Sequence, residues 1–171
     1  MTKMTPAYAT KMLRKLSEDK DYWRARENED SYYVASNDEE PVIPEYDYSE
    51  VAAKIAEIDE KVVKIKHAIN LSNTQNEVQV GNTSMTIDTI LVRMAQLNSR
   101  KEVLDNMRKS QPKSRVSGGY MADSKSVPEY RYINYDLDVV KKEYERIDTE
   151  IAQMQLALDK YNHTTEIEVD I

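Results

Sequence analysis

The residues best suited to chemistry lie between positions 108 and 131, where the chain is basic although the whole protein is acidic. The segment carries a net charge of +4 because it holds only two acidic residues, Asp123 and Glu129; the rest of the chain, whose total is −7, therefore carries −11. Its basic residues are Arg108, Lys109, Lys113, Arg115, Lys125 and Arg131. A basic zone on an acidic body suits a small anion better than a long polyanion. The alternative is that these side chains are simply solvated.

The middle of this segment combines positive charge with accessible backbone amides. The Gly118-Gly119 pair can turn N–H groups toward an anion, and Arg115 can bind a phosphate through two parallel hydrogen bonds. The tyrosines nearby can stack on a base or, alternatively, pack in an interface, where tyrosine is common. The predicted ligand-binding residues are Arg108, Lys113, Arg115, Ser117, Gly118, Gly119, Tyr120, Arg131 and Tyr132, with Tyr130 as a further stacking candidate.

Two pairs of carboxylates offer a different chemistry. Glu57 and Glu60, and likewise Glu102 and Asp105, have the i, i+3 spacing that places both carboxylates on one helix face, where they can share Mg²⁺ and activate water. The two pairs lie 42 residues apart, and in a chain with 32% charged residues this spacing also arises on an ordinary solvated face. His163 precedes several acidic residues without convincing ligand spacing. We expect no metal and no cofactor.

Several classes of protein are disfavoured by what the sequence lacks. The absence of cysteine excludes thiolate metal sites, thiol nucleophiles and a disulfide-stapled extracellular fold. There is no G-x-S-x-G elbow, no P-loop and no G-x-G-x-x-G motif. The N-terminus has no apolar signal region, and no apolar run reaches the roughly 18 residues of a membrane span. We expect a cytoplasmic protein, in the host cytoplasm if it is phage-encoded, that binds neither a membrane nor a nucleic-acid polymer.

The pattern of apolar residues, caps and breakers predicts a mainly α-helical fold in a single domain, residues 1–171. The chain has only three glycines and five prolines, which favours long regular elements. Helices are predicted at about 6–29, 50–70, 86–109 and 137–162, and short strands near 31–34, 77–85, 129–135 and 166–171. The expected helix starts are Thr5-Pro6, Ser49, Ser84 or Thr86, and Asp136.

The apolar stripes of the second and fourth predicted helices are narrow. From Val51 to Ile69, and from Leu137 to Tyr161, apolar residues recur at alternating spacings of three and four, which is the repeat of a coiled-coil seam. The fourth helix would span about 37 Å. Two apolar residues per heptad leave little surface for a multilayer core. We therefore expect long antiparallel helices with coiled-coil-like seams in an intertwined homo-oligomer.

Four short motifs follow one another along the chain in a characteristic order. The segment from Ile69 to Asn73 ends the second predicted helix, Thr86 to Arg93 opens the third, an aromatic strand follows the basic segment, and Tyr161-Asn162 ends the last helix. This order, together with the acidic connection at 34–44, resembles the septicolysin-like family of small bacterial helical proteins. The resemblance covers nearly the whole chain. It implies an intertwined α-helical oligomer, such as a hexamer, and implies little about activity.

The leading functional hypothesis is a non-enzymatic oligomeric protein that sequesters a small anionic ligand. We expect a nucleotide immune signal, such as a cyclic ADP-ribose variant or a cyclic dinucleotide, because phage-encoded sponges for such signals share this chain's character: small, cysteine-poor and oligomeric. Two alternatives stay open. One is a purely structural helical oligomer without a ligand. The other is a metal-dependent nucleotide pyrophosphohydrolase that uses the paired carboxylates.

Overall fold

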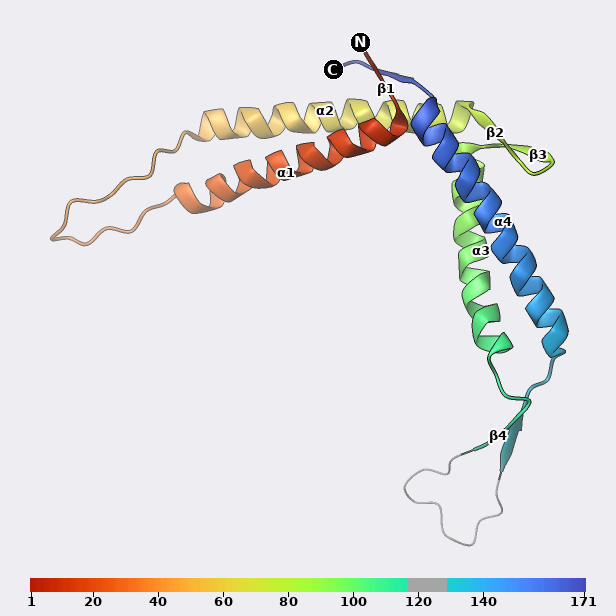
Figure 1. The fold of residues 1–171 in the computed structure, drawn as a ribbon. Helices are drawn as coiled ribbons and strands as arrows, with labels where there is room; N and C mark the ends of the chain where they lie inside the picture. Colours follow the sequence, from red (N-terminus) through yellow and green to blue (C-terminus); the bar gives the residue numbers. More distant parts are fainter. Residues whose placement is uncertain (117–128) are drawn as a thin grey trace, which may run out of the picture. The chain divides into compact units, whose positions relative to one another are not determined.

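The computed structural model describes residues 1–116 and 129–171, and in this part of the chain the fold is mainly helical with short antiparallel strand pairs, as the sequence predicted (Figure 1). The helices are α1 (Pro6–Asp30), α2 (Tyr48–Gln75), α3 (Ile87–Arg108) and α4 (Leu137–Thr164). The strands are β1 (Thr2–Met4), β2 (Glu77–Val80), β3 (Thr83–Thr86), β4 (Lys113–Arg115), β5 (Tyr130–Tyr132) and β6 (Ile167–Val169). No helix in the described residues combines the length and apolarity that a membrane crossing requires.

Short polar side chains set the helix starts. The Thr5 hydroxyl accepts a hydrogen bond from the Tyr8 N–H and Pro6 is the first helical residue of α1, while Thr86 caps α3 and Asp136 caps α4. The predicted Ser49 cap of α2 is wrong, because the Asp47 carboxylate accepts from the Ser49 and Glu50 N–H groups and the helix begins at Tyr48. An aspartate caps as well as a serine does, and it comes two residues earlier.

The second helix is also longer than predicted. It continues past Asn70 to Gln75, and Asn76 closes it by donating from its backbone and side-chain N–H groups to the Ser72 carbonyl. Residues 71–75 are polar apart from Leu71, so apolar periodicity does not reveal them. The last turn is instead held by hydrogen bonds, which leave no apolar pattern in the sequence.

The strand pairing differs from the prediction at the N-terminal part of the chain. Residues 32–35 form no strand. Instead β1 pairs antiparallel with β6, with Thr2 opposite Val169 and Met4 opposite Ile167. The three apolar members of this pair, Met4, Ile167 and Val169, are buried. Burial of apolar side chains therefore pairs two segments that lie at opposite ends of the sequence.

The chain divides into two compact units where the sequence predicted one domain. The first unit comprises Met1–Val78 and Ala157–Ile171, and the second comprises Gln79–Leu156. In the first unit α1 runs beside α2, and Ala9, Ile65 and the β1–β6 pair form the core (Figure 1). In the second unit α3 and α4 enclose a core of Leu104, Val140 and Ile147.

Candidate anion-binding ribbon

The strands β4 and β5, which flank the undescribed residues 117–128, form a two-stranded antiparallel ribbon in the second unit. Lys113 lies opposite Tyr132, and Arg115 lies opposite Tyr130. The Val116 N–H donates to the Glu129 carbonyl at 2.9 Å, and the Ile133 N–H donates to the Pro112 carbonyl at 3.3 Å. These two hydrogen bonds bracket the ribbon and fix its register.

This register places two cations and two tyrosines on one face of the ribbon. Directly opposite residues, and residues two apart on one strand, share a face, so Lys113 and Arg115 lie on the same face as Tyr130 and Tyr132. The Lys113 Nζ lies 4.2 Å from the centroid of the Tyr130 ring and 5.5 Å from that of Tyr132. Both rings keep much of their surface accessible, 45% for Tyr130 and 62% for Tyr132.

No acid among the described residues compensates the positive charge on this face. None of the carboxylates in the described part of the chain forms an ion pair with Lys113 or Arg115. Glu129, the acidic residue nearest in sequence, is two positions from Arg131 and so shares the opposite face. The ribbon thus presents an ammonium, a guanidinium and two aromatic rings together, which is a combination suited to an anion that carries an aromatic group.

The remaining predicted ligand-binding residues fall in three places. Arg131 lies on the opposite face of the ribbon, across from Ser114. Arg108 ends α3, where its guanidinium hydrogen-bonds to Asp105 and stacks 4.0 Å from the centroid of the Tyr144 ring. The hydrogen bond to Asp105 raises the pKa of Arg108. Ser117, Gly118, Gly119 and Tyr120 lie outside the described residues.

Tyr130 belongs to the ribbon face as fully as Tyr132 does. Its ring is the one nearest to the Lys113 ammonium. The alternation of β5 places both tyrosines on one face, which the sequence shows. The sequence does not show the pairing register, and that register is what brings the tyrosines to Lys113 and Arg115.

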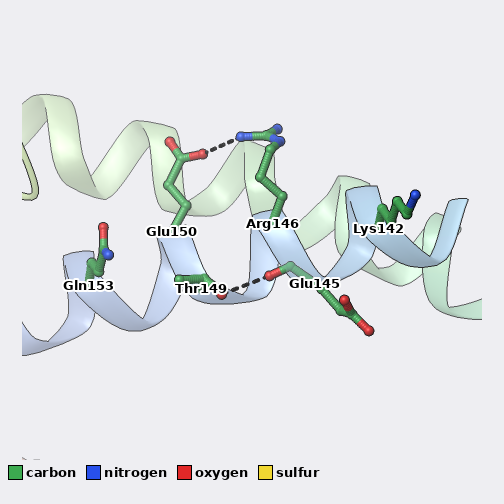
Figure 2. A pocket seen from close by; sticks show the side chains of 6 residues that line it. All are labelled: Lys142, Glu145, Arg146, Thr149, Glu150 and Gln153. Atoms are coloured by element: carbon green, nitrogen blue, oxygen red, sulfur yellow. Dashed lines mark hydrogen bonds and ion pairs between the residues drawn. The ribbon is translucent and has the colours of Figure 1, made fainter. Parts of the chain in front are cut away.

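A second candidate is a groove of about 570 Å³ along α4 (Figure 2). Its lining residues are Lys142, Glu145, Arg146, Thr149, Glu150 and Gln153, all from α4. Arg146 hydrogen-bonds to Glu143 and Glu150 at 2.8–2.9 Å, which raises the pKa of the guanidinium. Glu150 also accepts a hydrogen bond from Arg93 of α3. Because these charges neutralise one another, the groove has less to offer an anion than the ribbon face has.

Three of the four paired carboxylates, Glu57, Glu60 and Asp105, are engaged by cations of their own helices. Lys61 pairs with Glu57 at 2.6 Å and Lys64 pairs with Glu60 at 2.9 Å, and the pKa of Glu57 is lowered by the hydrogen bond from Lys61. Asp105 is bonded by Arg108 and Lys109. Among the residues that the structure describes, no three histidine or carboxylate side chains gather as a potential metal site. In this arrangement the carboxylates act as partners of lysine and arginine.

Comparison with known proteins supports the fold and leaves the activity open. No protein-family profile matches the sequence, and no curated protein sequence does. The chain is similar to a crystal structure of a functionally unknown conserved protein from Corynebacterium diphtheriae, with a TM-score of 0.66 and 15% sequence identity over 98% of this chain and 100% of that one. At this identity the likeness shows a shared fold along nearly the whole chain. The resemblance to the septicolysin-like family stays a prediction.

Proposed function

We propose that the protein is a non-enzymatic binding protein that sequesters a small anionic ligand of the nucleotide class on the β4–β5 ribbon. One observation supports this most strongly. Lys113 and Arg115, which have no carboxylate partner among the described residues, share one ribbon face with the accessible rings of Tyr130 and Tyr132. On an acidic protein, two cations without a described acidic partner favour the binding of an anion from outside the chain.

The spacing on the ribbon suits a nucleotide in particular. Alternate residues of a strand lie about 6.6 Å apart, so a phosphate at Arg115 and a base on a tyrosine ring would both be within reach of one ligand. The guanidinium can donate two parallel hydrogen bonds to phosphate oxygens. The Tyr130 and Tyr132 rings offer stacking surface, and stacking on an aromatic side chain contributes about 1–3 kcal/mol per base.

Sequestration requires that the ligand be enclosed, and an exposed two-stranded ribbon does not enclose it. We therefore propose that the protein acts as a homo-oligomer, a hexamer being one such assembly, in which neighbouring chains complete the pocket. It would work in the cytoplasm, in the manner of a phage anti-defence sponge that removes a cyclic ADP-ribose variant or a cyclic dinucleotide. The septicolysin-like resemblance, with its intertwined oligomer, supports the assembly and not the ligand.

A nucleotide-depletion assay tests this function. The protein is incubated with a panel of cyclic and linear nucleotides, the free nucleotide is measured, and the protein is then heated to release what it holds. Recovery of unchanged nucleotide supports sequestration, whereas recovery of altered nucleotide supports the pyrophosphohydrolase. If no nucleotide of the panel is depleted, the ligand-binding function is wrong for those compounds and the structural oligomer is favoured.

Two arginine variants on opposite faces provide the matched control. Arg115→Ala removes a charge-assisted contact, so affinity for the depleted nucleotide should fall about 10- to 100-fold in a calorimetric titration. Arg131→Ala removes the same charge from the opposite face and should change the affinity far less. Equal losses for the two variants would indicate unspecific attraction by charge and contradict the proposed site.

A further inference from the structure

We propose that residues 32–35 of one chain add as a strand to the outer edge of β5 in a second copy of the chain. The acidic arm is defined as residues 31–47, which connect α1 to α2. The proposal rests on three observations: a strand-forming segment that pairs with no other described residue of its own chain, a ribbon edge that no described strand covers, and opposite charge. It does not require that the ribbon binds a nucleotide.

The acidic arm contains a strand-like segment without a partner. Tyr32, Tyr33 and Val34 are residue types that favour strands, and the sequence predicts a strand at 31–34. In the structure residues 32–35 have no regular secondary structure and make no backbone hydrogen bond to any other described residue. Their side chains are 73%, 51% and 99% exposed in the order Tyr32, Tyr33, Val34. A segment of this composition with free N–H and C=O groups is suited to join a sheet.

Among the described strands only β4 pairs with β5, so the ribbon offers the outer edge of β5 to receive the segment. Hydrogen-bonded and non-hydrogen-bonded pairs alternate in an antiparallel ladder, and the bonded pairs include Val116 with Glu129 and Pro112 with Ile133. The residues between them on β5, Tyr130 and Tyr132, therefore direct their backbone N–H and C=O groups to the outer edge. A ribbon of only two strands is marginal by itself and gains from a third.

Charge selects the ribbon among the strand pairs of the described chain. The acidic arm carries Asp38, Glu39, Glu40, Glu45 and Asp47 and no lysine or arginine. The β4–β5 pair carries Lys113, Arg115 and Arg131 within its strands. By contrast, β1–β6 sets Lys3 against Glu168, and the sequences of strands β2 and β3 include the acidic Glu77 but no lysine or arginine. Electrostatic complementarity thus directs the arm to β4–β5.

The same charges disfavour pairing of an arm with an arm, or of a ribbon with a ribbon, between two copies. Two acidic arms would repel each other, as would two basic ribbons, because like charges brought close together repel one another. Tyr32 and Val34 share a face and can pack beside Tyr130 and Tyr132, since aromatic and β-branched residues form favourable cross-strand pairs. Among the described residues of one chain, neither residues 32–35 nor the outer edge of β5 pairs with a strand. If two copies exchanged arms, residues 32–35 and the outer edge of β5 would each gain a hydrogen-bonding partner.

Cysteine cross-linking tests the proposal directly, because the chain has no cysteine of its own. One copy carries Val34→Cys and the other carries Glu129→Cys, an exposed residue next to β5. The two copies are co-expressed with different tags, purified through both tags and treated with a short bis-maleimide. We expect a covalent dimer in clear excess over a control pair in which Val63→Cys, at an exposed position of α2, replaces Val34→Cys. A yield no higher than that of the control would overturn the proposal.

A single chain that carries both Val34→Cys and Glu129→Cys separates pairing between copies from pairing within one. If it cross-links only within itself and yields no covalent dimer, the arm pairs with its own ribbon and the proposal is wrong. If it yields covalent dimers, exchange between copies is supported. Because this readout contains no nucleotide, it can succeed or fail independently of the depletion assay.

Charge reversal provides a second, independent readout by sedimentation velocity. Changing Asp38, Glu39 and Glu40 together to lysine should weaken self-association about tenfold or more. Adding Arg131→Glu to that variant should restore part of the loss. The arm residues are exposed, so circular dichroism should show an unchanged helix content. Unaltered assembly in the triple variant, or no restoration by Arg131→Glu, would contradict the proposed contact.

Discussion

The hydroxyl groups of Ser72 and Tyr161 lie 2.5 Å apart and join the last turn of α2 to the last turn of α4 across 89 positions of sequence. Both residues are buried, with 8% and 3% of their surfaces exposed. The Asn76 side-chain amide donates to the Ser72 hydroxyl at 3.0 Å and to the Ser72 carbonyl at 2.9 Å. This small network is a buried polar contact within the first unit.

Removing either hydroxyl should destabilise the protein. Tyr161→Phe should lower the free energy of unfolding by about 1 kcal/mol, because Ser72 keeps its bond from Asn76. Ser72→Ala should cost about 1–3 kcal/mol, since the Tyr161 hydroxyl is left buried without that partner. Urea unfolding of both single variants and the double variant forms a cycle. Additive losses would show that the two hydroxyls do not interact.

Acid should weaken the second unit through Asp105. Hydrogen bonds from Lys109 and Arg108 lower the pKa of this carboxyl from its ordinary value of 3.8. The folded state therefore binds fewer protons than the unfolded state, so the stabilisation is complete above about pH 4 and is lost as the pH falls through the lower folded pKa. The melting temperature is measured between about pH 2 and 6. In Asp105→Asn it should fall less steeply, as the pH decreases, than in the unchanged protein. Glu102→Gln, which changes an exposed carboxyl of the same helix, serves as the control and should leave the acid dependence unchanged.

The core of the second unit should respond to a single truncation. Leu104 is 1% exposed and packs with Val140 and Ile147. Leu104→Ala should lower the free energy of unfolding by about 2–5 kcal/mol, because it removes buried methyl groups and leaves a cavity. The neighbouring Val103 is 48% exposed, so Val103→Ala should change it by less than about 0.5 kcal/mol. Similar losses for both variants would place the core elsewhere.

The β2–β3 turn should depend on glycine at position 81. Gly81 has a φ of +57°, and an added Cβ would lie 3.3 Å from the Gln153 Oε1. Gly81→Ala should cost about 1 kcal/mol, because alanine rarely adopts this backbone conformation, whereas Gly81→Asn should cost less. Adding Gln153→Ala to Gly81→Ala separates backbone strain from crowding. Full recovery in the double variant would show that crowding alone is responsible.

Much of the fold could be read from local signals. Thr5-Pro6, Thr86 and Asp136 start helices because their side chains satisfy N–H groups a few residues away, and this chemistry is visible in sequence. The Gly81-Asn82 turn is equally local. The end of α2 was missed because polar residues from Ser72 to Gln75 continue the helix through hydrogen bonds rather than through apolar periodicity.

The residue types of the candidate site could be predicted from the sequence, but their arrangement on the ribbon could not. The basic segment and its tyrosines are evident in the sequence, but the opposition of Lys113 to Tyr132 and of Arg115 to Tyr130 is a matter of register. Shifting the pairing by one residue would place the cations and rings on different faces. Arg108, the first residue of the basic segment, is instead held at the end of α3, where it contacts Asp105 and Tyr144.

By itself, the sequence determined the helical class, three of the four helix starts and the concentration of basic residues near one end of α3, because these depend on neighbours within about one turn or on composition alone. Only the tertiary structure decided that Thr2–Met4 pairs with Ile167–Val169 and that residues 32–35 pair with no other described strand. The physical reason is that strand pairing satisfies backbone groups through distant partners. Which partner is chosen depends on the apolar surface that the whole chain can bury together.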